Sequence, residues 1–193
     1  DLVTIRFKDD ATAFNAQKKQ KFNGKGVLNC SISSSIFDLL IKHKVPTHFI
    51  RKIDEDTILA KKVDIIPIEV VLRNIAYGSL CKQTDIKPGT NLKKPLIDFY
   101  YKNDKLNDPL LTLERINLLN LIGTEELLKV KKITNNINTI LKDFFLALDL
   151  TLVDFKLEFG RDSTGQIILA DEFSPDNCRL WDRNTKNGKI ESL

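Results

Sequence analysis

The sequence predicts an α+β fold. Most expected strands come first along the chain, expected helices follow, and regular β-α-β alternation is absent. Residues 153–159 give the clearest strand signal, since Val153, Phe155, Leu157 and Phe159 alternate with charged residues. Residues 124–148 give the clearest helical signal, an apolar stripe with helical spacing that we interpret as core packing.

The remaining elements follow from the same periodicities. We expect a polar loop at 9–15 and a first helix that Val45-Pro46 ends. A second, shorter helix precedes the long one, and Thr124 is the expected N-cap of the long helix. Pro67 interrupts an apolar run and suggests a hinge, which divides the chain into domains 1–65 and 66–193. Expected strands are 2–7, 47–53, 57–63, 68–74 and 96–102, and expected helices are 28–44, 113–122 and 124–148.

Composition narrows the class of protein. The 193 residues are 42% hydrophobic and 29% charged, as in a soluble globular protein, and no apolar run is long enough for a bilayer. Three scattered cysteines and the absence of a signal peptide predict a cytoplasmic protein. Two histidines make a His-rich metal site improbable. The absence of methionine suggests that residues have been omitted from a longer product.

Charges cluster first around the strand at 153–159. Asp154, Lys156 and Glu158 share the face opposite its apolar residues, and a turn at 162–165 would return Asp171 close to them. Carboxylates can bind Mg²⁺ while a lysine meets phosphate charge, so this two-stranded ribbon could hold a metal-bound polyphosphate. A solvated hairpin face explains the first three charges equally simply.

Two further segments carry candidate residues. Asp176, Arg179 and Asp182 lie close to a proline turn and to Trp181, an unusual density of charge for an inert loop. Glu69 and Arg73 share a strand face shortly before Gly78-Ser79, which could form a phosphate cradle or a purely structural ion pair. P-loop and GxGxxG sequences are absent.

Several of these stretches together resemble the SAICAR synthetase family. Its signatures are similar to residues 153–160 (VDFKLEFG), 171–176 (DEFSPD), 179–182 (RLWD) and 67–74 (PIEVVLRN) with Gly78-Ser79. Residues 8–15 (KDDATAFN) with Lys25-Gly26, and 102–104 (KND) with Asp108-Pro109, match other family segments. The similarity runs in order over nearly the whole chain. A Gly-Lys-Ala-Lys segment that begins family members, and a C-terminal helix, have no counterpart in the given sequence.

The resemblance implies a two-domain fold with antiparallel sheets and a nucleotide site in the cleft between the domains. It also implies a ligase that joins L-aspartate to carboxyaminoimidazole ribonucleotide (CAIR), with ATP and Mg²⁺, to give SAICAR, ADP and phosphate. An acyl phosphate is the expected intermediate. A homodimer is expected by analogy, and neither a nucleic acid nor a membrane is an expected partner.

The resemblance also assigns roles to residues. By position, Glu158 and Asp171 match magnesium ligands, and Lys156 matches a lysine near the transferred phosphoryl group. Glu69 and Asp154 lie in the same motifs and are candidate catalytic residues. Ribonucleotide-binding positions are Arg73, Ser79, Asp176 and Arg179; adenine-binding positions are Lys61 and Ile65; candidate aspartate-binding positions are Asp10, Asn15 and Lys25.

Two other functions remain open on the residues alone. A small-molecule or inositol-phosphate-type kinase could also place magnesium carboxylates on a hairpin. A net charge of +4 and a pI of about 8.9 would suit a nucleic-acid-binding module, although the basic residues are dispersed among 26 acids.

Overall fold

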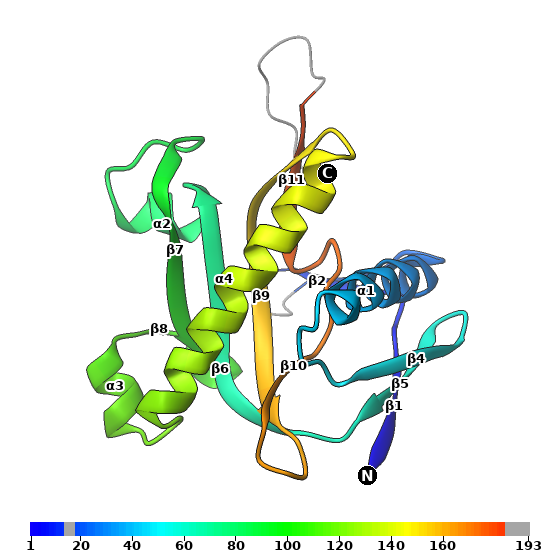
Figure 1. Ribbon diagram of the computed structural model, residues 1–193. Coiled ribbons are helices and arrows are strands. Elements are labelled where there is room, and N and C mark those ends of the chain that lie inside the picture. The colour runs from blue at the N-terminus through cyan, green and yellow to red at the C-terminus, as the bar shows by residue number, and fades with distance from the viewer. Residues whose placement is uncertain (14–17, 184–193) are drawn as a thin grey trace.

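A computed structural model describes residues 1–13 and 18–183, and its strands form three separate antiparallel sheets (Figure 1). The largest sheet has six strands in the order β10-β9-β6-β7-β8, with β11 paired to the other part of β9. Its strands are β6 (Asp64–Ile75), β7 (Asn91–Tyr101), β8 (Leu110–Leu111), β9 (Leu150–Arg161), β10 (Ile167–Ala170) and β11 (Cys178–Asp182).

The two smaller sheets lie toward the N-terminal part of the chain. A three-stranded sheet has the order β1-β5-β4, and a two-stranded sheet pairs β2 with β3. Their strands are β1 (Leu2–Arg6), β2 (Asp10–Ala13), β3 (Lys18–Lys21), β4 (Phe49–Asp54) and β5 (Thr57–Lys61). The helices are α1 (Lys25–Lys42), α2 (Ser79–Gln83), α3 (Leu113–Leu118) and α4 (Thr124–Leu146), with a 3₁₀ turn η1 (Asp104–Leu106).

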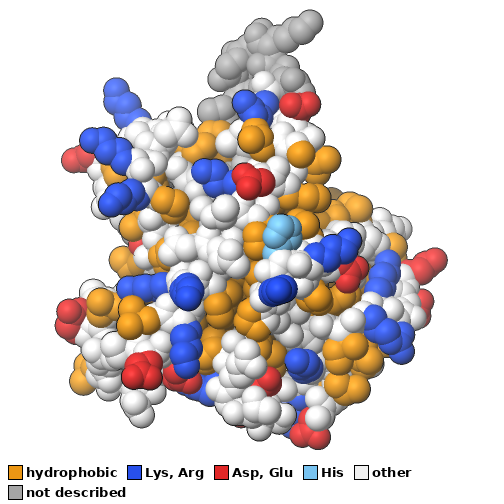
Figure 2. All heavy atoms as spheres, viewed as in Figure 1, with side chains coloured by type: hydrophobic (Ala, Val, Ile, Leu, Met, Phe, Trp, Pro, Cys, Tyr) orange, Lys and Arg blue, Asp and Glu red, His pale blue; other side chains and the backbone are white. Residues whose placement is uncertain are grey.

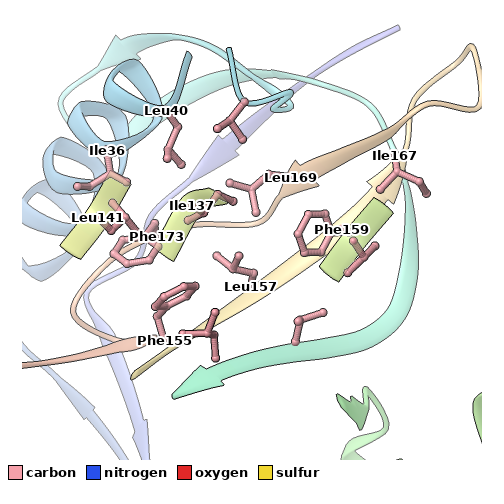
Figure 3. Close-up of a cluster of buried hydrophobic side chains, with 14 of the residues drawn as sticks. Ile36, Leu40, Ile137, Leu141, Phe155, Leu157, Phe159, Ile167, Leu169 and Phe173 are labelled. Carbon is pink, nitrogen blue, oxygen red and sulfur yellow. The ribbon is translucent and has the colours of Figure 1, made fainter. Parts of the chain in front are cut away.

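The hydrophobic core lies on one face of the six-stranded sheet. Alternation along β9 buries Phe155, Leu157 and Phe159 on this face, where α4 crosses the sheet. Figure 3 shows that the same cluster extends to α1. Ile36 and Leu40 of that helix point toward the side chains of β9, β10 and α4. The core is therefore continuous between α1 and the large sheet. Val153, which was predicted to share a face with Phe155, instead packs with Ile75 and Trp181 in a separate small cluster, where the pairing of β11 with β9 shifts register.

Most expected elements are present, with several corrections. The strand at 2–7, the hairpin of 47–53 with 57–63 and the helix at 28–44 are confirmed, with shifted ends. Residues 65–67 lie inside β6, but the pairing of β6 with β9 shifts register between Ile65 and Glu69, an irregularity of the kind where proline is tolerated in a sheet. Residues 10–13 form β2 rather than a loop. The helix expected at 113–122 ends at Leu118.

The start of the long helix differs by one residue from the prediction. Thr124 is the first helical residue, and Gly123 is the N-cap. The side chain of Glu126 accepts a hydrogen bond from the backbone N–H of Gly123 at 3.1 Å, which satisfies that exposed donor. Glu126 also pairs with Arg161 on β9 at 2.7 Å, so the helix start is fixed to the sheet. The domain division at 65 and 66 stays a prediction.

None of the helices among residues 1–13 and 18–183 combines the length and the apolar character that crossing a membrane requires.

Backbone contacts around His48 join the small sheet to the large one. The N–H of His48 donates to the carbonyl of Leu169 on β10, at 2.8 Å, and the N–H of Lys61 donates to the carbonyl of His48 at 2.7 Å. Thr47 forms a parallel bridge with Leu169. The His48 side chain is only 2% exposed. The end of β10, and hence Asp171 after it, is therefore fixed against the N-terminal part of the protein.

Burial makes His48 an acid-sensitive point in the fold. Desolvation lowers the pKa of its imidazole from 6.5 to about 4, opposed by a backbone hydrogen bond to Asp171. Below pH 6.5 the unfolded chain takes up a proton at His48, while the folded chain does so only near pH 4. The free energy of unfolding should therefore fall across this window, by on the order of 3 kcal/mol from this residue.

Urea unfolding at a series of pH values measures this effect. We expect the decline between pH 6.5 and 4 to be shallower in His48→Gln than in the unchanged protein. His43→Gln, at an exposed position, should keep the original slope. Equal slopes in His48→Gln and the unchanged protein would contradict the interpretation.

Candidate functional site

Strand register gathers the candidate charges on one face of the large sheet. Glu69 on β6 lies opposite Glu158 on β9, and Arg73 lies opposite Asp154. Residues directly opposite each other in antiparallel strands point to the same side, so these side chains share a face with Lys156. On β11, Arg179 also lies opposite Asp154. The predicted two-stranded ribbon is thus part of a wider sheet, with β6 beside β9.

Asp154 connects two arginines at one end of this face. Its Oδ2 accepts from Arg73 Nη1 at 3.0 Å and from Arg179 Nη1 at 2.7 Å. Asp154 and Arg73 are buried, with 5% and 3% exposure, so the alternative of a solvated face does not hold for Asp154. Burial raises the pKa of Asp154, and the two arginines oppose that rise. Arg73 and Arg179 are thereby fixed side by side, and guanidinium groups suit the paired hydrogen bonds that an anion such as phosphate accepts.

Arg73 is held from several directions. Its Nη2 donates to Ser79 Oγ at 2.8 Å, and its Nη1 reaches the carbonyl of Tyr77 at 3.3 Å. Asp98 and Tyr100 of β7 complete the contacts, each at 3.3 Å. Ser79 opens α2 immediately after Gly78, whose φ of 61° is a conformation that favours glycine. The structure therefore brings Arg73 and Ser79 together, as the sequence predicts for a phosphate cradle.

Lysines and carboxylates alternate at the other end of the face. Lys156 Nζ donates to Glu69 Oε1 at 2.8 Å and to Glu158 Oε1 at 3.0 Å, and Lys102 donates to Glu158 Oε2. Burial opposes charge on both Lys156 and Glu158. The carboxylates nevertheless raise the pKa of Lys156, and the two lysines lower the pKa of Glu158. Both groups are therefore held in their charged forms.

Asp171 lies next to this cluster, as the hairpin prediction requires. It follows β10, whose last residue, Ala170, is opposite Glu158, and it has a φ of 60°. Burial, and next the negative charge of Glu158, raise the pKa of Asp171. In the part of the chain that the structure describes, no cluster of three or more metal-ligating side chains exists. Asp171 and Glu158 are neighbouring carboxylates, since the charge of one affects the pKa of the other.

A cavity of about 550 Å³, here called the central cavity, opens over the arginine end of the face. Its polar lining and its two arginines make it suited to a charged ligand rather than an apolar one. The residues that line it are Glu69, Val71, Arg73, Tyr77, Asp154, Phe155, Lys156, Pro175, Asp176, Asn177, Cys178 and Arg179.

A second cavity of about 280 Å³, the flanking cavity, adjoins it through Asp176. It contains the expected Asp10 and Lys25, together with Glu172 and Asn29. Lys25 donates to Asp176 Oδ2, and Asn29 Nδ2 donates to the same oxygen at 2.9 Å. Burial raises the pKa of Glu172, whose Oε2 has no hydrogen-bond partner.

Within the described residues, four predicted positions do not line these cavities: Lys61, Ile65, Ser79 and Glu158. Ile65, 43% exposed, lies at the start of β6 opposite Gly160, and Lys61 ends β5. Neither residue lines the central or the flanking cavity. Asn15 lies outside the described residues.

Sequence reasoning missed the contribution of β7. Asp98, Tyr100 and Lys102 alternate along the chain, and all three contact the charged face through Arg73 or Glu158. That alternation was a usable signal, but the pairing of β7 with β6 was needed to place it beside the site. Tyr77 and Asn177 were also missed, because loop positions carry no periodicity.

Comparison with known proteins agrees with this geometry. A protein from Prochlorococcus marinus subsp. pastoris (strain CCMP1986 / NIES-2087 / MED4), called phosphoribosylaminoimidazole-succinocarboxamide synthase, is 65% identical over 193 residues. The match covers 100% of this chain and 80% of that protein. A protein of the same name from Synechococcus sp. (strain CC9605) is 53% identical, with coverage of 100% and 77%.

Solved structures give the same result. A SAICAR synthetase in complex with ADP is 44% identical with a TM-score of 0.94, and the match covers 100% of this chain and 80% of that one. SAICAR synthetase from Pyrococcus horikoshii OT3 is 44% identical with a TM-score of 0.93, covering 100% and 82%. The family model of SAICAR synthetase matches residues 1–193. This chain belongs to the SAICAR synthetase family.

Proposed function

We propose that this chain is an ATP-dependent ligase that joins the amine of L-aspartate to the carboxylate of CAIR, giving SAICAR, ADP and phosphate. Membership of the SAICAR synthetase family supports this activity. The observation that carries the proposal is the single charged face, where two arginines meet at Asp154 and two lysines meet at Glu158.

The chemistry requires activation of a carboxylate, since its negative charge repels an amine and oxide is a poor leaving group. Transfer of the γ-phosphoryl group from ATP to a carboxylate oxygen releases ADP and forms an acyl phosphate. The amine of aspartate then attacks the carbonyl carbon, loses a proton and displaces phosphate as the amide bond forms. Exclusion of water protects the acyl phosphate from hydrolysis.

The arginine end of the face supports ribonucleotide binding. Arg73 and Arg179 line the central cavity, and Ser79 accepts a hydrogen bond from Arg73, so this group of donors supports binding of a phosphate monoester. Asp176 lines both cavities and is placed to contact the nucleotide from the opposite side. Asp154 orients both arginines, so its role in the reaction is to position them.

The lysine end supports the ATP phosphates. Glu158 and Asp171 fit a magnesium ion, because a buried carboxylate and a neighbouring half-buried one raise the energy of each other's charge and a shared cation relieves that cost. Magnesium would supply neutralisation of phosphate charge. Lys156, charged and held by Glu69, would meet the transferred phosphoryl group. Adenine would lie near Ile65 and Lys61, toward the far end of β6 and β9.

The flanking cavity is our candidate for the L-aspartate site. Lys25 offers a positive charge for a substrate carboxylate, and the carboxylate of Asp10 can accept from its ammonium group. The cavity adjoins the central cavity at Asp176, which would bring the amine close to the activated carboxylate. Homodimer formation is also proposed by analogy with the family.

The family result favours the ligase over both alternatives. A kinase would release a stable phosphorylated product rather than free phosphate. A nucleic-acid-binding module would need a continuous basic surface. On the face shown in Figure 2, lysines and arginines are instead dispersed, with acidic side chains between them.

Coupled ADP release tests the reaction. With ATP, magnesium, L-aspartate and CAIR present, we expect ADP and SAICAR in equal amounts. Omission of aspartate should abolish sustained ADP release, because an acyl phosphate shielded from water has no acceptor. ADP release at the same rate with and without L-aspartate, or accumulation of a stable phosphorylated product, would argue against the ligase.

Removal of either proposed magnesium ligand should abolish turnover. We expect Glu158→Ala and Asp171→Ala each to lower kcat by at least about 1,000-fold, since catalysis of phosphoryl transfer depends on charge stabilisation. Glu126→Gln removes a carboxylate that pairs with Arg161 away from the cavities, and it should retain activity. Near-normal rates in both cavity variants, with circular dichroism unchanged, would refute the magnesium assignment.

A pair of glycine substitutions tests the placement of Arg179. A Cβ added to Gly78 would lie 2.8 Å from Arg179 Nη1, whereas one added to Gly165 meets nothing within 4 Å. Both glycines have positive φ, so both alanine variants carry backbone strain of about 1–3 kcal/mol, and Gly78, with a ψ of −129°, lies outside the left-handed region. Only Gly78→Ala should also raise the KM for CAIR, as Arg179→Ala should. An equal KM in the two glycine variants would contradict the assignment of Arg179.

A further inference from the structure

Two aromatic side chains lie beside Arg179, and the reaction described above assigns no role to them. The Cζ atom of Arg179 lies 5.2 Å from the centroid of the Tyr77 ring. The Tyr77 ring meets Trp181 edge-on, with centroids 5.6 Å apart and an interplanar angle of 85°. Trp181 is 6% exposed, whereas Tyr77 is 36% exposed and lines the central cavity. A buried tryptophan thus supports a ring that faces the cavity.

The guanidinium of Arg179 is consequently restrained on several sides. Its Nη1 donates to Asp154 Oδ2 at 2.7 Å, and the backbone at Gly78 approaches so closely that a Cβ there would lie 2.8 Å from Nη1. The Tyr77 ring provides a third contact, and a cation near an aromatic ring is attracted by the quadrupole of the ring. Arginine loses considerable rotamer freedom when it binds a ligand, so prior restraint favours binding.

We propose that Tyr77 is a positioning residue for ribonucleotide binding: its ring holds the guanidinium of Arg179 in the orientation that receives the phosphate of the substrate. This inference rests on the proposed function of the central cavity. The ring carries the effect, and the hydroxyl is not required. Tyr77 acts through Arg179, while the carbonyl of Tyr77 accepts from Arg73 Nη1 at 3.3 Å and so links both arginines to one segment.

Substitutions that keep or remove the ring test the proposal. Tyr77→Phe should leave the KM for CAIR within twofold of the unchanged protein. Tyr77→Leu and Tyr77→Met, which keep much of the volume without a ring, should raise it by about fivefold, as expected for loss of a partly exposed cation–π contact. The kcat and the KM for ATP should stay within twofold. Equal KM values for CAIR in Phe and Leu variants would overturn the proposal.

A double-substitution cycle separates action through Arg179 from direct contact with the ligand. In an Arg179→Ala background, Tyr77→Leu should have no further effect on the KM for CAIR, because the group that the ring positions is absent. If the ring instead stacked on the substrate, the fivefold effect would persist in that background. Persistence would overturn the positioning role.

Trp181 provides a measurement that does not depend on turnover. It is the one tryptophan of the sequence, so intrinsic fluorescence reports on the surroundings of Tyr77 and Arg179. Titration with ribose 5-phosphate should change the emission, with a Kd about fivefold weaker in Tyr77→Leu and unchanged in Tyr77→Phe. A Kd that does not depend on the ring would overturn the positioning role.

The two readouts distinguish the further inference from the proposed function. Ring-dependent binding of ribose 5-phosphate, without any turnover of CAIR, would support the role of Tyr77 and reject the ligase. Turnover of CAIR, with binding of ribose 5-phosphate that does not depend on the ring, would support the ligase and reject the role of Tyr77. If Tyr77→Leu does not fold, as judged by circular dichroism, Tyr77→Met supplies the same comparison with Tyr77→Phe.

Discussion

Compensation of buried charge on one face of the central sheet is the constraint on which the site depends. Asp154 and Glu158 are almost fully buried, and each accepts from two cationic side chains. An isolated carboxylate in such a place would be costly, and removal of a partner usually destabilises a buried pair by about 3–5 kcal/mol. Each buried carboxylate is therefore stabilised by its cationic partners. The register between β6, β9 and β11 places charged residues of these strands opposite one another on one face.

The same compensation prepares the site for anionic ligands. Asp154 and Asp98 hold Arg73, and Asp154 also holds Arg179, so both guanidinium groups are fixed beside the central cavity before a ligand binds. Around Glu158, the lysines already hold the carboxylate ionised, and no proton has to leave before a cation binds. Groups that are charged and fixed in advance need little reorganisation, which is how preorganised sites stabilise developing charge.

Much of this could be predicted from the sequence, because the strand at β9 has strict alternation and a marked turn. That signal placed Asp154, Lys156 and Glu158 on one face and Asp171 beside them. Burial was not predictable, because Asp154 and Glu158 are covered by residues from β6, β7 and β11 that local patterns do not pair. For the same reason, the contact of Lys102 with Glu158 was not predicted. Thr124 was mistaken for the N-cap because the side chain of Glu126 satisfies the start of α4.

The most direct test of the central claim is a crystal structure with a non-hydrolysable ATP analogue, magnesium and the ribonucleotide bound. The account predicts magnesium at about 2.1 Å from oxygens of Glu158 and Asp171 and of the triphosphate. It also predicts the ribonucleotide phosphate against Arg73 and Arg179. A triphosphate bound away from β9, with Glu158 and Asp171 still engaged only by protein groups, would contradict the account.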